Sequence, residues 1–409
     1  MKPIDLTTPW KNSTTGLHHT NQIYLDNNST TGLAEVTAQA ILKCWQEGLA
    51  NPASQHQTGQ ACSRTLNQAS DSILSLLDAS TDQFPADKLV WTSCGTEANN
   101  LVLLGRCLGD SEQLRSGNIV LSGIEHPSVM STAQYLAKMG LDVRIADVDS
   151  NGVVIIDHLK RLVDESTLVV SVMLANNETG VIQPVAEIAE FCREANVFCH
   201  TDAVQAIGKI DVSFAGLGVD ALTFAPHKFH GPVGIAGLIL KPTSDLQPRL
   251  LGGFQQEGLR PGTENVALAV GAATTLAWYL GEREKHRQHL LHLRDRFETQ
   301  LLQDVPDAVI IGNLANRLPH TSCVAFPGLN RQELVLAADV AGIACSTGSA
   351  CASGSSDPSP VLQKMNLPPA WVNGALRFSF GLFNELDEAT EAARRISLLH
   401  NKLRSRNGT

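Results

Sequence analysis

The stretch LVVSVML (168–174) consists of apolar and small residues, and a strand with this composition is buried on both faces of a sheet. Six similar runs surround it, and helix-compatible segments separate them. The runs are KLVWTS (88–93), NIVLS (118–122), LDVRIA (141–146), VFCH (197–200), VDALTF (219–224) and GIAGLIL (234–240). Alternation of strands and helices predicts an α/β fold with a mostly parallel, seven-stranded sheet.

The character of the chain changes after GTENVALAVGAATTLAWYL (262–280). Residues 264–303 have helical periodicity and many charges, without a strand signal. Two candidate strands follow, SCVAF (322–326) and ALRFSF (375–380). We therefore predict a boundary near residue 282, between a large domain, 23–282, and a smaller α/β domain, 283–409. Residues 1–22 are expected to pack on the smaller domain.

The composition of the 409 residues excludes several classes of partner. There are 31 basic and 41 acidic residues, and the net charge of −10 argues against binding of nucleic acid or of an anionic membrane surface. No apolar run reaches the roughly 18 residues that span a bilayer. The first residues have no pattern of a secretory or transit signal, so we expect a cytoplasmic protein. The nine cysteines include no C-x-x-C pair and no zinc-type cluster, which favours free thiols and no metal site.

The segment Cys94-Gly95-Thr96-Glu97 follows the run at 88–93 and leads into a helical stretch. A glycine turn before a helix offers free N–H groups and a favourable dipole to a phosphate group. The alternative is an ordinary capped helix with Thr96 as the N-cap.

Two further polar residues follow strand-like runs. Asp202 comes after 197–200 and, taken alone, suits a helix cap, a metal ligand or the partner of a protonated ring nitrogen. Lys228 comes after 219–224, where a hydrophobic run meets a Gly-Pro turn. Ligands bind at the carboxyl ends of strands in such sheets. A phosphate loop, an acid and a lysine at one edge are what pyridoxal phosphate requires, because the acid keeps the ring protonated as an electron sink.

Ten motifs, spread in order over residues 23–381, resemble those of the NifS/IscS-type cysteine desulfurases. This group belongs to the class V aminotransferases, which are fold-type I transferases dependent on pyridoxal phosphate. The motifs are YLDNNSTTG (24–32), NPASQHQTG (51–59), TSCGTEANN (92–100), EHPSV (125–129), NNETGVIQP (176–184), HTDAVQAIGK (200–209), APHKFHGPVG (225–234), GGFQQEGLRPGTEN (252–265), STGSACASG (346–354) and ALRFSFG (375–381).

The resemblance implies a role for each matching residue. Lys228 would hold the cofactor covalently, and His126 would stack on its ring and assist proton transfer. The other implied cofactor contacts are Asp202 with the ring nitrogen, Gln205 with the ring hydroxyl, Asn177, and Gly95, Thr96 and His227 with the phosphate. Thr263 would complete the phosphate site of a second subunit, which implies a homodimer.

The resemblance also implies the substrate site and the nucleophile. Asn177 and Arg377 would bind the carboxylate of L-cysteine, a task that suits the planar arginine fork. Cys351 lies in the Gly/Ser-rich stretch 348–360, which is typical of a long flexible loop. Its thiolate would take the substrate sulfur as a persulfide, with alanine as the other product. A protein acceptor such as an iron–sulfur scaffold would then receive the sulfur.

The sequence is also compatible with other functions. A selenocysteine lyase or another class V enzyme such as an aminotransferase has the same scaffold, and so does a cofactor-binding protein without activity. Ala225 stands where the family has a serine that bonds the phosphate, a loss that Thr223 could offset. Asn27, Asn28, Ser29 and Gly32 also depart from the family pattern near the substrate.

Overall fold

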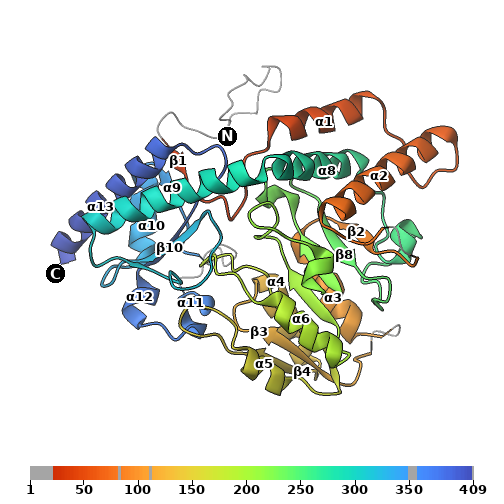
Figure 1. Ribbon diagram of the computed structural model, residues 1–409, viewed down its shortest axis with the longest axis horizontal. Coiled ribbons are helices and arrows are strands. Elements are labelled where there is room, and N and C mark those ends of the chain that lie inside the picture. Colours follow the sequence, from red (N-terminus) through yellow and green to blue (C-terminus); the bar gives the residue numbers. More distant parts are fainter. Residues whose placement is uncertain (1–21, 82–83, 110–112, 349–356, 408–409) are drawn as a thin grey trace, which may run out of the picture.

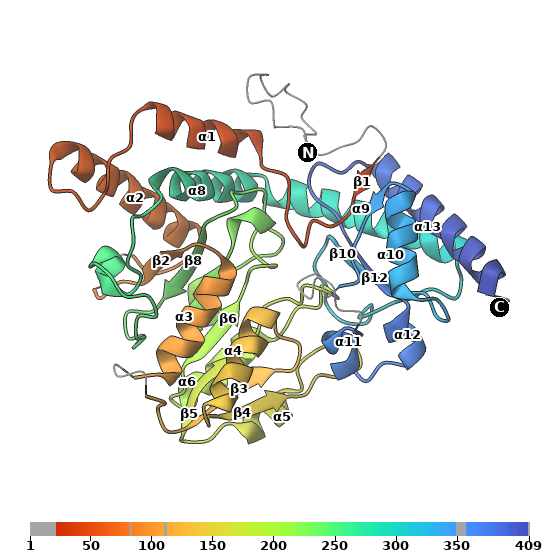
Figure 2. The same ribbon diagram turned by 180° about the vertical axis from the view of Figure 1, so that it is seen from behind.

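The computed structural model describes residues 22–81, 84–109, 113–348 and 357–407. Its main sheet has seven strands in the order β2-β8-β7-β6-β5-β3-β4, shown in Figures 1 and 2. They are β2 (Lys88–Thr92), β3 (Asn118–Ser122), β4 (Asp142–Ala146), β5 (Thr167–Ser171), β6 (Cys199–Asp202), β7 (Ala221–Phe224) and β8 (Ala236–Leu240). β8 runs antiparallel to both of its neighbours, β2 and β7, and all other neighbouring pairs in this sheet are parallel. The predicted class and the seven predicted strands are confirmed.

Helices cover both faces of this sheet, as the apolar runs require. In β3, Ile119 and Leu121 belong to one core and Val120 belongs to the other, because successive side chains point to opposite faces. The first core lies under α3 (Gly95–Cys107) and α4 (Pro127–Lys138). The helices of the opposite core include α1 (Glu35–Gln46), α2 (Gln57–Leu76), α5 (Ile156–Leu162), α6 (Val185–Glu194), the short α7 (Phe214–Leu217) and α8 (Val266–Gly281).

The C-terminal part contains a smaller antiparallel sheet in the order β12-β10-β9. The helices and strands of the whole C-terminal part are α9 (Arg283–Asp304), β9 (Val309–Ile310), β10 (Thr321–Ala325), α10 (Arg331–Val340), β11 (Ile343–Ala344), α11 (Pro360–Lys364), α12 (Pro369–Asn373), β12 (Ala375–Ser379) and α13 (Leu386–Asn407). The strands predicted at 322–326 and 375–380 are thus confirmed. Figure 1 shows α9 and α13 lying side by side.

Glu282 separates α8 from α9, and the predicted division into domains at this residue stays a prediction. The C-terminal part has its own core of buried side chains, such as Leu290, Phe297 and Phe378. However, Cys323 and Met365 belong to the large core on the main sheet. At the other end of the chain, β1 (Ile23–Tyr24) pairs in parallel with β11. Residues 1–21, expected to pack on this part, lie outside the described residues.

The topology gathers the predicted site residues at one edge of the main sheet. β7, β6, β5 and β3 are consecutive parallel neighbours, so their carboxyl ends lie side by side. The chain segments that leave these four ends carry Lys228, Asp202, Asn177 and His126, in that order. None of the helices described is long and apolar enough to cross a membrane.

Candidate active site

Hydrogen bonds hold both the side-chain amine and the backbone carbonyl of Lys228. It ends the 3-10 turn η1 (Pro226–Lys228), directly after β7. Its Nζ donates to the backbone carbonyls of Asn28 and Ser29, at 2.6 Å each. Its own carbonyl accepts a hydrogen bond from Nζ of Lys209, also at 2.6 Å. The lysine amine therefore lies against the loop that follows β1.

Lys209 is a second lysine of the site, and its residue type and position in the sequence do not predict a role for it. It is 3% exposed, and its Nζ lies 5.4 Å from the centre of the Tyr279 ring. Burial, with a smaller contribution from the charge of Lys228, lowers its pKa to about 7. Its position at the end of the motif HTDAVQAIGK was the only signal in the sequence.

The acid and the amide of the same motif, Asp202 and Gln205, are both buried. Asp202 is 6% exposed, and its two oxygens accept from Val204 N at 3.0 Å and from Asn99 Nδ2 at 2.7 Å. Gln205 Nε2 donates to the Asn28 carbonyl at 3.0 Å, so Gln205 and Lys228 share one acceptor.

The predicted phosphate loop forms a helix start, but its N-cap differs from the prediction. α3 begins at Gly95, its N-cap is Cys94, and Thr96 lies inside the first turn. The alternative interpretation, with Thr96 as the N-cap, is wrong because Gly95 itself belongs to the helix. A Cβ added at Gly95 would lie 3.2 Å from Val204 Cγ2 and 3.8 Å from Ala225 Cβ, so the start of α3 lies against the segments after β6 and β7.

His227 and His126 flank this arrangement. Nδ1 of His227 lies 3.2 Å from Thr30 Oγ1. Burial, helped by the charges of Lys228 and Lys209, lowers the pKa of His227 to about 4, so the ring is neutral near pH 7. His126 is the N-cap of α4 and accepts the N–H of Ser128.

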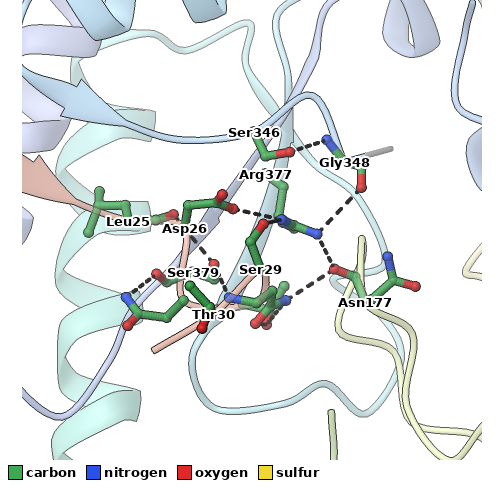
Figure 3. Close-up of polar contacts among 12 residues, drawn as sticks. Leu25, Asp26, Ser29, Thr30, Asn177, Ser346, Gly348, Arg377 and Ser379 are labelled. Atoms are coloured by element: carbon green, nitrogen blue, oxygen red, sulfur yellow. Dashed lines mark hydrogen bonds and ion pairs between the residues drawn. The ribbon is translucent and has the colours of Figure 1, made fainter. Parts of the chain in front are cut away.

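Arg377, in β12, is the centre of a second group of contacts (Figure 3). It is 2% exposed, and its Nη2 donates to Asp26 Oδ1 at 2.7 Å and to Ser29 Oγ at 3.1 Å. Its Nη1 donates to the Asn177 carbonyl at 2.9 Å. Within the described chain, Nε of Arg377 is buried and has no hydrogen-bond partner. One donor of the guanidinium is therefore unsatisfied among the described residues, while Nη1 also lies 3.4 Å from the Gly348 carbonyl.

The loop residues Asn28 and Ser29 join the two groups. Asn28 accepts from Lys228 through its carbonyl and donates through Nδ2 to the Asn177 carbonyl at 3.1 Å. Ser29 likewise contacts both Lys228 and Arg377. The lysine and the arginine are thus linked through one short loop.

Thr263 is not part of this arrangement. Thr263 is exposed in the loop between η2 (Gln255–Gly258) and α8, and within the described residues it makes no hydrogen bond to the others of the site. Cys351 lies outside the described residues. In the part of the chain that is described, no three metal-binding side chains are grouped as a metal site would require.

The chain is similar to one known family over almost its whole length. The family model described as aminotransferase class-V matches residues 23–391. The chain belongs to the class-V aminotransferase family.

The relatives of this class-V protein include cysteine desulfurases. It is 35% identical over 383 residues to cysteine desulfurase NifS of Azotobacter vinelandii, and the match covers 94% of each chain. It is 39% identical over 359 residues to a cysteine desulfurase of Cereibacter sphaeroides, covering 88% of this chain and 90% of the relative. A solved NifS-like protein superposes with a TM-score of 0.85 and 32% identity, covering 93% of this chain and all of that one. The resemblance predicted from the motifs is confirmed.

The class-V site fits pyridoxal phosphate, the cofactor that the family and these relatives imply. Cys94 makes no side-chain cap hydrogen bond, so the first N–H groups of the 13-residue α3 suit a phosphate group. A buried carboxylate and a lysine amine lie at the neighbouring strand ends, which matches the ring nitrogen and aldehyde of the cofactor.

Ala225→Ser is expected to tighten binding of pyridoxal phosphate by about tenfold. The serine hydroxyl on this Cβ would donate one hydrogen bond to the charged phosphate of the cofactor. Thr223 does not supply it, since its Oγ1 lies 3.0 Å from His200 Nε2 and its methyl group faces Gly95. Titration of cofactor-free protein, followed by absorbance, measures the affinity. Thr223→Val is the control and should leave it unchanged. An unchanged affinity in Ala225→Ser would contradict the prediction.

Glu125→Gln is expected to flatten the pH dependence of stability. Burial raises the pKa of Glu125 to about 8, although Ser122 Oγ and Met173 N donate hydrogen bonds to it. The unfolded chain loses this proton near pH 4.5, so the stability contribution is complete below that pH and is lost as pH rises to about 8. Glutamine has no such proton.

Urea unfolding at several pH values between 5 and 8.5, within the window set by these pKa values, checks this prediction. The stability of Glu125→Gln relative to wild type should increase as pH rises across the window. The exposed Glu47→Gln is the control and should behave as wild type. The prediction fails if Glu125→Gln keeps the slope of the wild type.

Proposed function

We propose that the chain is a cysteine desulfurase that converts L-cysteine to L-alanine and leaves the sulfur as a persulfide on Cys351. The observation that carries the proposal is the loop Asn28–Ser29, which contacts both Lys228 and Arg377. A group bound to the lysine and an amino-acid carboxylate bound to the arginine would meet at this loop. The similarity to cysteine desulfurases supports cysteine as the amino acid.

We propose that pyridoxal phosphate is held by the residues gathered at the sheet edge. Lys228 would hold it covalently and Asp202 would pair with its ring nitrogen. The further contacts would be Gln205, His126 and Asn177 at the ring, and Gly95, Thr96 and His227 at the phosphate. When bound, the cofactor supplies an electron sink that makes the Cβ–S bond of cysteine labile.

The residues of the chain would divide the remaining work. Arg377, with Asn177 beside it, binds the substrate carboxylate and fixes the orientation of the substrate. The Cys351 thiolate attacks the substrate sulfur, so an S–S bond forms while the Cβ–S bond breaks. The electron pair of the broken bond stays on the three-carbon fragment, which takes up protons and leaves as alanine.

We also propose a homodimer in which Thr263 of one subunit completes the phosphate site of the other. In the single chain Thr263 is exposed, and Leu251 and Phe254 of the preceding loop are 90% and 93% exposed. Apolar side chains so exposed favour burial against a second copy.

We propose that the sulfur acceptor is a protein, such as an iron–sulfur scaffold. The net charge of −10 favours a protein over RNA, because RNA is itself negatively charged. We further propose that the transfer takes place in the cytoplasm.

A single-turnover reaction of cofactor-loaded protein with L-cysteine tests the proposal. Alanine is measured by chromatography and the sulfur adduct by peptide mass spectrometry. We expect alanine in equal amount to persulfide on Cys351, and loss of both in Cys351→Ser. Cys345→Ser is the matched control and should keep both, because burial raises the pKa of Cys345 to about 12 and holds it as a thiol.

The other outcomes point to other reactions. Alanine from selenocysteine alone would indicate a selenocysteine lyase. Turnover that requires a keto acid would indicate an aminotransferase. Cofactor absorbance without any product would indicate a binding protein that has lost activity.

A further inference from the structure

A chain of hydrogen bonds connects Asp202 to His126 through two residues without a role so far. Asn99 Nδ2 donates to Asp202 Oδ2 at 2.7 Å and to Ser128 Oγ at 2.9 Å. Ser128 Oγ lies 2.7 Å from Nδ1 of His126. Asn99 is 1% exposed and Ser128 is 7% exposed, so water does not replace these contacts easily.

The direction of each bond follows from the chemistry of the groups. A carboxylate only accepts, so the amide nitrogen of Asn99, not its oxygen, has to face Asp202. The second hydrogen of the same nitrogen goes to Ser128 Oγ. The serine hydroxyl then has one hydrogen of its own, which it can donate to Nδ1 of His126.

A second donor acts on the same nitrogen of His126. As the N-cap of α4, His126 accepts the backbone N–H of Ser128 at 3.1 Å through Nδ1. A backbone N–H is always a donor, so Nδ1 has to present its lone pair. The neutral ring therefore carries its hydrogen on Nε2. The opposite tautomer would set the N–H of His126 against the N–H of Ser128 and leave the helix end unsatisfied.

We propose that Asn99 and Ser128 are positioning residues that couple Asp202 to His126 and fix neutral His126 as the Nε2–H tautomer. His126 then meets the ligand as a hydrogen-bond donor, and in its neutral form it does not serve as a base at Nε2. The role toward a ligand rests on the proposed function. The tautomer and its coupling to Asn99 stand without it.

Solid-state ¹⁵N NMR of the cofactor-loaded protein, labelled at histidine, tests the tautomer directly. The His126 signals are assigned as those missing from His126→Gln. We expect a pyridine-type resonance for Nδ1 and a pyrrole-type resonance for Nε2. In Ser128→Ala, and in Asn99→Leu, the Nδ1 resonance should move toward the value of a less strongly hydrogen-bonded nitrogen.

Thr132→Val is the matched control on the same helix. It removes a buried hydroxyl that donates to Asn100 Oδ1 and to the Ser128 carbonyl but contacts no atom of the His126 ring in the described structure. Its His126 signals should equal those of wild type. A protonated Nδ1 in the wild type, or equal His126 signals in Ser128→Ala and wild type, would overturn the proposal.

Kinetics provide a second readout. Ser128→Ala should lower kcat/KM for L-cysteine about fivefold, as expected for one neutral hydrogen bond. Asn99→Leu should lower it by at least about tenfold, because Asp202 also loses a donor. If the protein has no desulfurase activity at all, the proposed function fails while the NMR result still decides the tautomer.

Discussion

Lys228→Ala is expected to lower the rate of alanine formation from L-cysteine by at least about a thousandfold. The amine shares the Asn28 carbonyl with Gln205, and its two carbonyl partners belong to the loop that also contacts Arg377. Among the described residues, no other lysine amine donates hydrogen bonds to the carbonyls of Asn28 and Ser29. Borohydride reduction followed by peptide mass spectrometry should label residue 228 in wild type and leave the variant unlabelled.

Lys241→Met is the matched control for this experiment. Nζ of Lys241 also donates to a backbone carbonyl, that of Gly218, at 2.8 Å. However, Lys241 follows β8, which is antiparallel to β7, so it lies at the opposite edge of the sheet. This variant should keep its activity. Activity of Lys228→Ala within tenfold of wild type would refute the assigned role.

Arg377→Met is expected to lower kcat/KM for L-cysteine by about a hundredfold or more, mainly through KM. The substitution removes the buried guanidinium and leaves Asp26 without its cation, and truncation of one partner of a buried charge pair costs about 2–5 kcal/mol. Steady-state kinetics measure the loss of substrate binding, and thermal unfolding measures the loss of stability. In the double variant Arg377→Met with Asp26→Asn, the lost stability should be recovered, because Asp26 is no longer left charged, but KM should stay raised.

A second buried arginine separates the two effects. Arg317 makes two hydrogen bonds to Glu298, at 2.9 and 3.1 Å, in the same part of the molecule. Arg317→Met should lower stability by a similar amount and leave KM unchanged. An unchanged KM in Arg377→Met would show that the substrate carboxylate is bound elsewhere.

The main sheet could be predicted from the sequence because each strand carries its own signal. Runs such as 118–122 and 168–174 are apolar on both faces, and this pattern has few interpretations in a chain with intervening helices. Because Asp202 and Lys228 come at the ends of two strand runs, the sequence also predicted that both would lie at one edge of the sheet, as the parallel pairing of β6 and β7 confirms. Cys199 and Cys323 are buried because they lie in such apolar strands, and Cys192 is buried on the apolar face of α6.

The hydrogen bonds that connect the residues of the site leave no comparable pattern in the sequence. Asn28 is 200 residues from Lys228, and Ser29 is 348 residues from Arg377, so no periodicity relates them. Asn99 and Ser128 have roles only because α3 and α4 pack side by side. Lys209 was visible within a motif, but only the fold shows that its amine holds the Lys228 carbonyl.

The pairing of β1 with β11 bears on how the chain folds during its synthesis. Ile23 leaves the ribosome early, yet its partner Ile343 is made about 320 residues later. At typical rates of translation the wait is on the order of tens of seconds. Throughout this time β1 has no partner strand, although the large sheet can already form. A two-residue strand is a poor template for aggregation, which makes so long a wait tolerable.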